Sequence, residues 1–199
     1  YMGYSDNPPY DLIPLDDNFQ NQVTSLDLTA NPWTAWRSNL NLSHMLDQTD
    51  QAQADPYNPS QTPDFVHTQR NVVDWQNDVS LGEHQLLTAG LYSEEQHASS
   101  QSYGLAYDVP DRINAIYLED DLNAGKNRLV IAARDTRDQE FGNYLTWNAD
   151  YAYDVSANTR LTAGAGTGFR APSATELYGF GGNPNLQPET SQNLEIGLR

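Results

Sequence analysis

The chain has 199 residues and no cysteine, so it is long enough for one domain and contains no disulfide framework. It carries 27 acidic against 10 basic residues, and the resulting formal charge of -17 disfavours binding to nucleic acid and to anionic membrane surfaces. Hydrophobic residues make up 38% of the chain and the mean hydropathy is -0.70, which excludes a large apolar core. No apolar run reaches the roughly 18 to 20 residues of a transmembrane helix.

The first 20 residues are rich in Pro, Asp and Asn, and we expect a surface loop there. From Asn21 onward, apolar side chains alternate with polar ones, which is the pattern of strands with one apolar face. The pattern predicts nine strands, at about residues 21–30, 34–47, 65–81, 85–96, 112–122, 127–137, 143–155, 159–170 and 190–199.

The connections between these strands differ at the two ends of the predicted sheet. Those at 31–33, 82–84, 123–126 and 156–158 are tight turns, whereas the opposite ends are joined mostly by longer stretches, at 48–64, 97–111 and 171–189. Strands of this length with short turns on one side and long loops on the other are typical of a lipid-embedded barrel. A soluble sandwich normally has shorter strands. The predicted fold class is therefore all-β, an antiparallel up-and-down transmembrane β-barrel segment of about nine strands.

The last 40 residues carry a resemblance to a known family. Gly168-Phe169-Arg170-Ala171-Pro172, Glu176-Leu177-Tyr178, Gly182-Asn183-Pro184-Asn185-Leu186 and Pro188-Glu189 follow one another between two alternating strands. This run resembles the late-barrel signature of TonB-dependent outer-membrane receptors, and within that family it is most similar to the cobalamin (vitamin B12) type. The resemblance implies a barrel in the outer membrane of a Gram-negative bacterium, which binds a nutrient at its extracellular loops and passes it through the lumen.

The resemblance also bears on domain organisation and partners. A large transporter barrel needs about 22 strands and a plug in its lumen. Residues 1–199 are then part of one barrel domain, and we expect the plug and the remaining strands to lie outside this chain. The implied partners are the nutrient, outer-membrane lipid and TonB, which acts through the plug.

Four candidate site residues follow from the resemblance. In the cobalamin transporters, loop carboxylates and a neighbouring Tyr bind calcium, an ion that prefers several oxygen ligands. Carried over by position, Tyr1 and Asp16 are the candidate calcium ligands, with Met2 where the family has an Asp. Gly3 and Thr62 fall at positions that contact the cargo.

Two alternatives remain open on the sequence. One is an iron siderophore receptor of the same family, and the other is a soluble secreted β-protein that binds carbohydrate through its many Tyr and Trp residues. Catalysis is not indicated, because the four histidines are scattered without metal-ligand spacing. For Arg170 and Glu189, at the two ends of the last long loop, we expect charge-assisted hydrogen bonds that anchor the loop.

Overall fold

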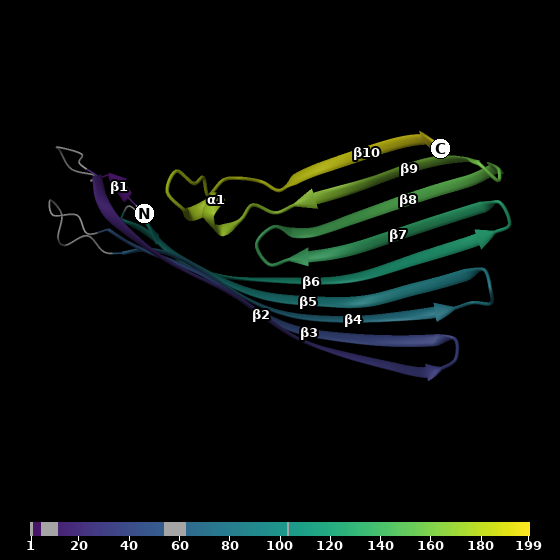
Figure 1. Cartoon of the computed structure of the whole chain (residues 1–199), viewed down its shortest axis with the longest axis horizontal. Coiled ribbons are helices and arrows are strands. Elements are labelled where there is room, and N and C mark those ends of the chain that lie inside the picture. The colour runs from purple at the N-terminus through teal and green to yellow at the C-terminus, as the bar shows by residue number, and fades with distance from the viewer. Residues whose placement is uncertain (1, 5–11, 54–62, 103) are drawn as a thin grey trace.

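The computed structural model of the chain describes residues 2–4, 12–53, 63–102 and 104–199. They form one sheet whose ten strands are hydrogen-bonded in chain order, each antiparallel to the next (Figure 1). The strands are β1 (Met2–Tyr4), β2 (Leu12–Trp33), β3 (Trp36–Gln53), β4 (Asp64–Ser80), β5 (Gln85–Ser102), β6 (Leu105–Ala124), β7 (Asn127–Asp138), β8 (Gly142–Ser156), β9 (Thr159–Arg170) and β10 (Glu189–Leu198). Among the described residues the one helix is α1 (Ala174–Tyr178), between β9 and β10, and no helix there is long and apolar enough to cross a membrane.

One face of the sheet is apolar, as the alternation predicts. The register places an apolar row across β2 to β6, in which each residue lies opposite the next: Leu28, Leu40, Trp75, Leu91 and Ile116. These side chains are not covered by protein, since Trp75 is 43% and Ile116 58% exposed. Water-exposed apolar surface on this scale is rare in monomeric soluble proteins, whereas the lipid-facing band of a barrel requires it. We call this the outer face.

The opposite face, called the inner face, is mainly polar. Among the described residues the buried hydrophobic side chains are only those of Ala98, Ala115 and Leu177, so no dry core lies on either side of the sheet. Inter-strand hydrogen bonds therefore hold the described chain together, and they leave open edges at β10 and at β2 beyond its three pairs with β1. Unpaired edges are costly in hydrocarbon, so both need neighbouring strands in a membrane.

The four tight turns are confirmed and lie at one end of the sheet, which we call the turn end. The strands on either side of each turn are separated by two to four residues, at 34–35, 81–84, 125–126 and 157–158. Gly82 and Gly125 have φ angles of 76° and 61°, which glycine adopts without a steric penalty. The predicted turn at 31–33 is shifted, because β2 continues to Trp33.

At the other end, called the loop end, the predicted loops are partly wrong. Residues 1–20 were expected to be a loop, yet β1 pairs with the start of β2 and Pro14 lies opposite Met2. Residues 97–111 were also expected to be a loop, yet β5 continues to Ser102 and β6 begins at Leu105. β3 likewise continues to Gln53. Beyond the membrane both faces of a strand meet water, so the alternation disappears although the hydrogen-bond ladder continues.

Pro110 shows why a proline is tolerated in this extended ladder. It lies within β6 opposite His97 of β5. Two residues further on, the Arg112 carbonyl accepts a hydrogen bond from the Gln139 amide, on the β7 side. In an antiparallel strand, alternate residues point their backbone groups to the same side, so the Pro110 nitrogen also faces the β7 side, where β7 has already ended.

Candidate ligand-binding face

A row of five cross-strand residues, three of them apolar or aromatic, crosses the inner face at the loop end. It consists of the residues paired in turn across β2 to β6: Phe19, Thr49, Val66, Ser100 and Tyr107. We call it the loop-end row. Phe19 is 66% and Val66 43% exposed, on a face that is mainly polar, whereas Ser100 is buried. Exposed apolar groups with a polar surround are typical of a ligand-binding surface.

The helix α1 lies beside this row. The Tyr107 and Thr175 hydroxyls are 2.9 Å apart, and the rings of Tyr107 and Tyr178 have centroids 6.4 Å apart. The Tyr178 hydroxyl donates to Glu140, in the turn between β7 and β8, at 2.6 Å. Leu177, which is 3% exposed, is the buried residue of the helix. The β9–β10 loop is therefore packed onto the sheet next to the row.

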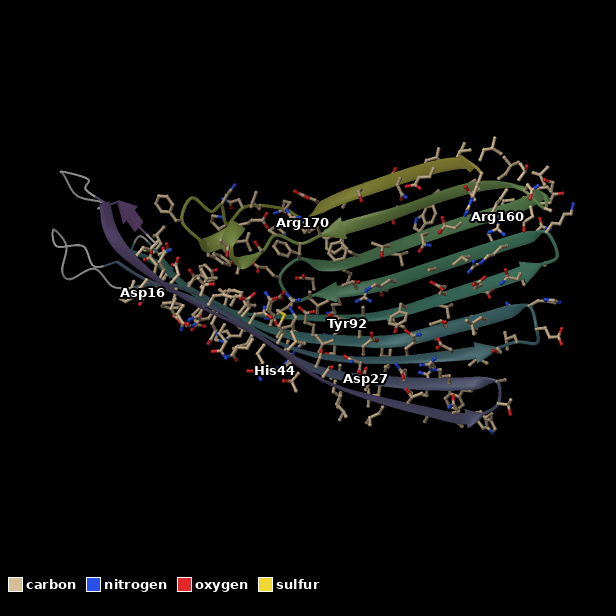
Figure 2. All side chains as sticks on the ribbon, viewed as in Figure 1. Asp16, Asp27, His44, Tyr92, Arg160 and Arg170 are labelled. Atoms are coloured by element: carbon tan, nitrogen blue, oxygen red, sulfur yellow. The ribbon has the colours of Figure 1, made fainter. Side chains whose placement is uncertain are left out.

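A charged cluster fixes both ends of this loop. Arg170 contacts Glu176 at 2.9 Å and Glu189 at 3.2 Å, which confirms the anchoring expected for Arg170 and Glu189 (Figure 2 shows Arg170 beside α1). Glu176 also closes a capping box with Ser173, whose side chain accepts from the Glu176 amide and whose amide donates to the Glu176 carboxylate. The loop was not predicted to contain a helix.

Glycine is required at Gly182, where the chain leaves α1. A Cβ there would lie 2.9 to 3.0 Å from three backbone carbonyl oxygens, those of Glu176, Leu177 and Gly179. Backbone atoms cannot rotate away, so any larger residue would push the loop off the helix.

The charged cluster gives a pH-dependent expectation. Hydrogen bonds from Arg170, and secondly from Ser173, lower the pKa of Glu176 from 4.5 to about 2. Because the pKa of Glu176 is lower in the folded loop than in the unfolded chain, the ionised carboxylate stabilises the folded loop at pH values above about 4.5. This stabilisation is lost as the pH falls from about 4.5 towards 2. We expect hydrogen-exchange protection factors of the α1 amides to decrease across this range. They should be smaller and nearly pH-independent in Glu176→Gln. Equal pH profiles in the two proteins would contradict the assignment.

A second polar network lies on the inner face further from the loop end. The Arg134 guanidinium lies 4.8 Å from the ring centroid of Tyr92 and 5.9 Å from that of Tyr117. Tyr92 donates to Glu94, which Arg70 also contacts at 2.9 Å. Tyr92 lies midway along its strand (Figure 2). The network links β4, β5, β6 and β7 and leaves the cations of this region occupied by aromatic or acidic partners.

Gly90 makes room for this network. A Cβ at Gly90 would lie 2.1 Å from Cζ of Tyr117, whose hydroxyl donates to Asp74 at 3.0 Å. We expect Gly90→Ala to displace the Tyr117 ring and to lower stability by about 1 to 3 kcal/mol, the usual cost of overpacking. Urea unfolding in detergent measures this change. The double variant Gly90→Ala with Tyr117→Ala should be more stable than the sum of its single changes predicts, and strict additivity would contradict the contact.

The predicted site residues lie partly within the described chain. Asp16 is exposed at the loop end of β2, opposite Ala52 (Figure 2). Gly3 of β1 lies opposite Ile13 of β2, and Ile13 is three residues before Asp16 along that strand. The structure therefore brings Gly3 and Asp16 to one corner of the sheet, whereas Tyr1 and Thr62 fall outside the described residues. Within the described ranges, no three His, Asp or Glu side chains are grouped as they would be around a metal ion.

The loop-end row was missed from the sequence. Phe19 lies in a segment expected to be a loop, and Tyr107 in another. The register that aligns them joins residues from five strands, and local alternation carries no information about it. The aromatic side chains themselves were the one available signal.

A sheet of long antiparallel strands with an exposed apolar outer face and a polar inner face is a segment of a transmembrane β-barrel. The sequence matches the family described as TonB dependent receptor-like, beta-barrel, over residues 2–199. The chain belongs to this family, whose barrels lie in the outer membrane. The prediction of a receptor and not an enzyme is confirmed, and the alternative of a soluble carbohydrate-binding protein is wrong.

Three known proteins illustrate the similarity. The vitamin B12 transporter BtuB of Photobacterium profundum is 35% identical over 135 residues, which are 67% of this chain and 22% of that protein. The ferric enterobactin receptor PfeA of Pseudomonas aeruginosa has a TM-score of 0.78 at 17% identity. The match covers 92% of this chain and 32% of the PfeA chain. The siderophore receptor PirA of the same organism has a TM-score of 0.78 at 17% identity, covering 94% and 37%. The chain thus spans between a fifth and two fifths of their lengths.

Proposed function

We propose that this chain is part of a receptor that takes up cobalamin across the outer membrane. Cargo binds at the loop end of the inner face and enters the lumen when TonB acts on a plug. The 35% identity to a vitamin B12 transporter supports this cargo, because the siderophore receptors share the fold at 17% identity.

The charges around the loop-end row support the same cargo. Three carboxylates lie on the inner face, each two residues along its strand from a member of the row: Asp17, Asp47 and Asp64. Burial, and secondly the neighbouring Asp138 carboxylate, raise the pKa of Asp111 on β6, above the apolar band. The carboxyl groups of Asp17, Asp47, Asp64 and Asp111 make the inner face at this end acidic.

The nearby cations are already engaged. Arg70 contacts Glu94, Arg134 lies over two tyrosine rings, and Arg170 contacts two glutamates. An iron chelate with net negative charge would meet repulsion here, and each of these three arginines already has an acidic or aromatic partner. A large ligand with no net charge, such as cyanocobalamin, instead gains from the exposed apolar row. This combination of an apolar row with paired arginines is the observation that carries the proposal.

Binding to the purified outer-membrane protein tests the cargo. We expect cyanocobalamin to bind and a negatively charged ferric siderophore not to bind, in equilibrium titrations with and without calcium. Phe19→Ala should weaken cobalamin binding about tenfold, because truncating one well-buried contact typically costs about 1 to 2 kcal/mol. Leu26→Ala, on the outer face of the same strand, is the matched control and should bind as the unchanged protein does.

The second candidate is an iron siderophore receptor, which the structural similarity to PfeA and PirA favours. Tight siderophore binding without cobalamin binding would overturn the cobalamin proposal in its favour. Calcium at Tyr1 and Asp16, with cargo contacts at Gly3 and Thr62, forms part of the same proposal. It predicts that Asp16→Asn reduces the increase in cobalamin affinity that calcium produces.

A further inference from the structure

Four of the ten basic residues of the chain lie together at the turn end of the inner face: Lys126, Arg128, Arg160 and Arg199. All but Arg128 line a hollow of about 570 Å³, together with the turn between β8 and β9. Figure 2 shows Arg160 at this end of β9. Because the chain as a whole has a formal charge of -17, cations gathered in one corner favour contact with an anionic partner.

Backbone pairing aligns these side chains across the strand ends. The Asp154 amide donates to the Lys126 carbonyl at 2.8 Å, and Asp154 lies opposite Arg160. Arg160 and Arg199 exchange two backbone hydrogen bonds. We call Lys126, Asp154, Arg160 and Arg199 the basic row. Neighbouring strands lie about 4.8 Å apart, so the row spans about 14 Å across the ends of β7 to β10.

Two cations of the basic row have no acidic partner. Asp154 accepts two hydrogen bonds from Arg160, at 2.6 and 3.0 Å, so this central pair is neutral. The Lys126 ammonium contacts a backbone carbonyl at 3.4 Å. Within the described ranges, neither Lys126 nor Arg199 forms an ion pair. The row therefore presents one positive charge at each end.

The basic row faces away from lipid. The outer-face residues at the same strand ends are Tyr153, Leu161 and Leu198, in which Leu161 pairs with both of the others. The short turns of outer-membrane barrels lie on the periplasmic side. The row therefore lies at the periplasmic mouth of the lumen, at the opposite end of the sheet from the loop-end row.

We propose that the basic row binds an acidic segment of a separate periplasmic polypeptide. The segment lies extended across the ends of β7 to β10, and its carboxylates accept hydrogen bonds from Lys126 and Arg199. Such hydrogen bonds are stronger than those between neutral groups, because donor and acceptor are both charged. An extended chain rises about 3.3 Å per residue, so carboxylates four positions apart lie about 13 Å apart and reach both ends of the row.

Fluorine NMR titrations of the full-length protein in non-ionic detergent at low ionic strength test the proposal. The probe is a capped five-residue peptide with glutamate at its first and last positions, serine between them and a fluorinated cap. We expect it to bind about threefold more tightly than the isomer with adjacent glutamates. Lys126→Gln and Arg199→Gln should each weaken binding of the probe about threefold, the usual effect of one exposed ion pair. The double variant should weaken it about tenfold.

Arg37→Gln is the matched control, because Arg37 is an exposed arginine on the inner face at the turn end of β3, opposite Asp78. It should leave binding of the probe unchanged. An equal loss in Arg37→Gln would reveal non-specific charge attraction and overturn the proposal. Absence of probe binding to the full-length protein would also overturn it, because the row is then covered by the receptor itself.

Phosphatidylglycerol, titrated into the same variants and followed by native mass spectrometry, separates a polypeptide partner from an anionic lipid. We expect Lys126→Gln and Arg199→Gln to leave the dissociation constant of the first bound lipid unchanged. Weaker lipid binding in these variants with unchanged probe binding would overturn the proposal in favour of a lipid. None of these outcomes depends on which cargo the receptor transports.

Discussion

Leu118→Arg is expected to destabilise the membrane-inserted protein by about 2 to 4 kcal/mol, the cost of an arginine on the lipid face near the bilayer centre. Leu118 is 51% exposed on the outer face of β6, where it pairs with Ala89 and Ala133. A guanidinium there must either enter hydrocarbon or distort the strand to reach water. Folding into lipid vesicles, followed by urea titration, measures the free energy.

The neighbouring residue provides the matched control. Glu119 lies on the inner face, opposite Thr88 and Ala132. Glu119→Arg introduces the same side chain one position along the strand, and we expect a change within about 1 kcal/mol because the new charge meets water. If both variants lose the same stability, the assignment of the two faces is wrong.

Leu177→Ala is expected to release the β9–β10 loop. Leu177 is 3% exposed and is the buried residue of α1. Removing a buried leucine side chain costs about 2 to 5 kcal/mol. Here the loss lowers the free energy of local loop opening and leaves the stability of the whole barrel unchanged. Amide hydrogen exchange in α1 should accelerate at least about 30-fold, since each 1.4 kcal/mol corresponds to a factor of ten. Exchange in β5 and β6 should be unchanged.

Leu186→Ala makes the same substitution in the same loop. Leu186 is 37% exposed, so its truncation removes less buried apolar surface. We expect exchange in α1 to change less than about threefold in this variant. Similar acceleration by both substitutions would show that the loop is held by its length and charges and not by Leu177.

The strands were predictable because hydrocarbon on one side and water on the other impose a period of two. Leu161, Ala163 and Ala165 alternate with polar or glycine residues, and they form β9 with the predicted bounds of 159 to 170. The turns at Gly82 and Gly125 were predictable for a related reason. Few residues other than glycine accept their positive φ angles, so the sequence itself marks the reversal.

The errors lie where that constraint ends. Between Gln96 and Asp111 neither face lies against hydrocarbon, and the polar side chains on both sides were interpreted as a loop, although the strands continue. The helix α1 is a different case. Ser173 and Glu176 are spaced as in a capping box, which is a recognisable helix start, but the surrounding glycines and prolines dominated the interpretation.

The arrangement of the candidate site could not be predicted, because it depends on long-range register. Phe19 and Tyr107 are 88 positions apart in the sequence and reach the same row only through four strand pairings. A shift of one residue in any pairing would move a side chain to the other face. The Arg170 cluster was predictable because a loop must bring its own two ends together.

The chain contains no cysteine, so single cysteines can be introduced one at a time at 116 to 119 in β6 and spin-labelled in the membrane-inserted protein. The ratio of label collisions with oxygen, which concentrates in lipid, to collisions with a water-soluble nickel chelate reports the surroundings of each label. High ratios at Ile116 and Leu118 with low ratios at Tyr117 and Glu119 are the predicted result. A ratio that does not alternate, or that is high at Tyr117 and Glu119, would contradict the claim that the apolar face lies against lipid.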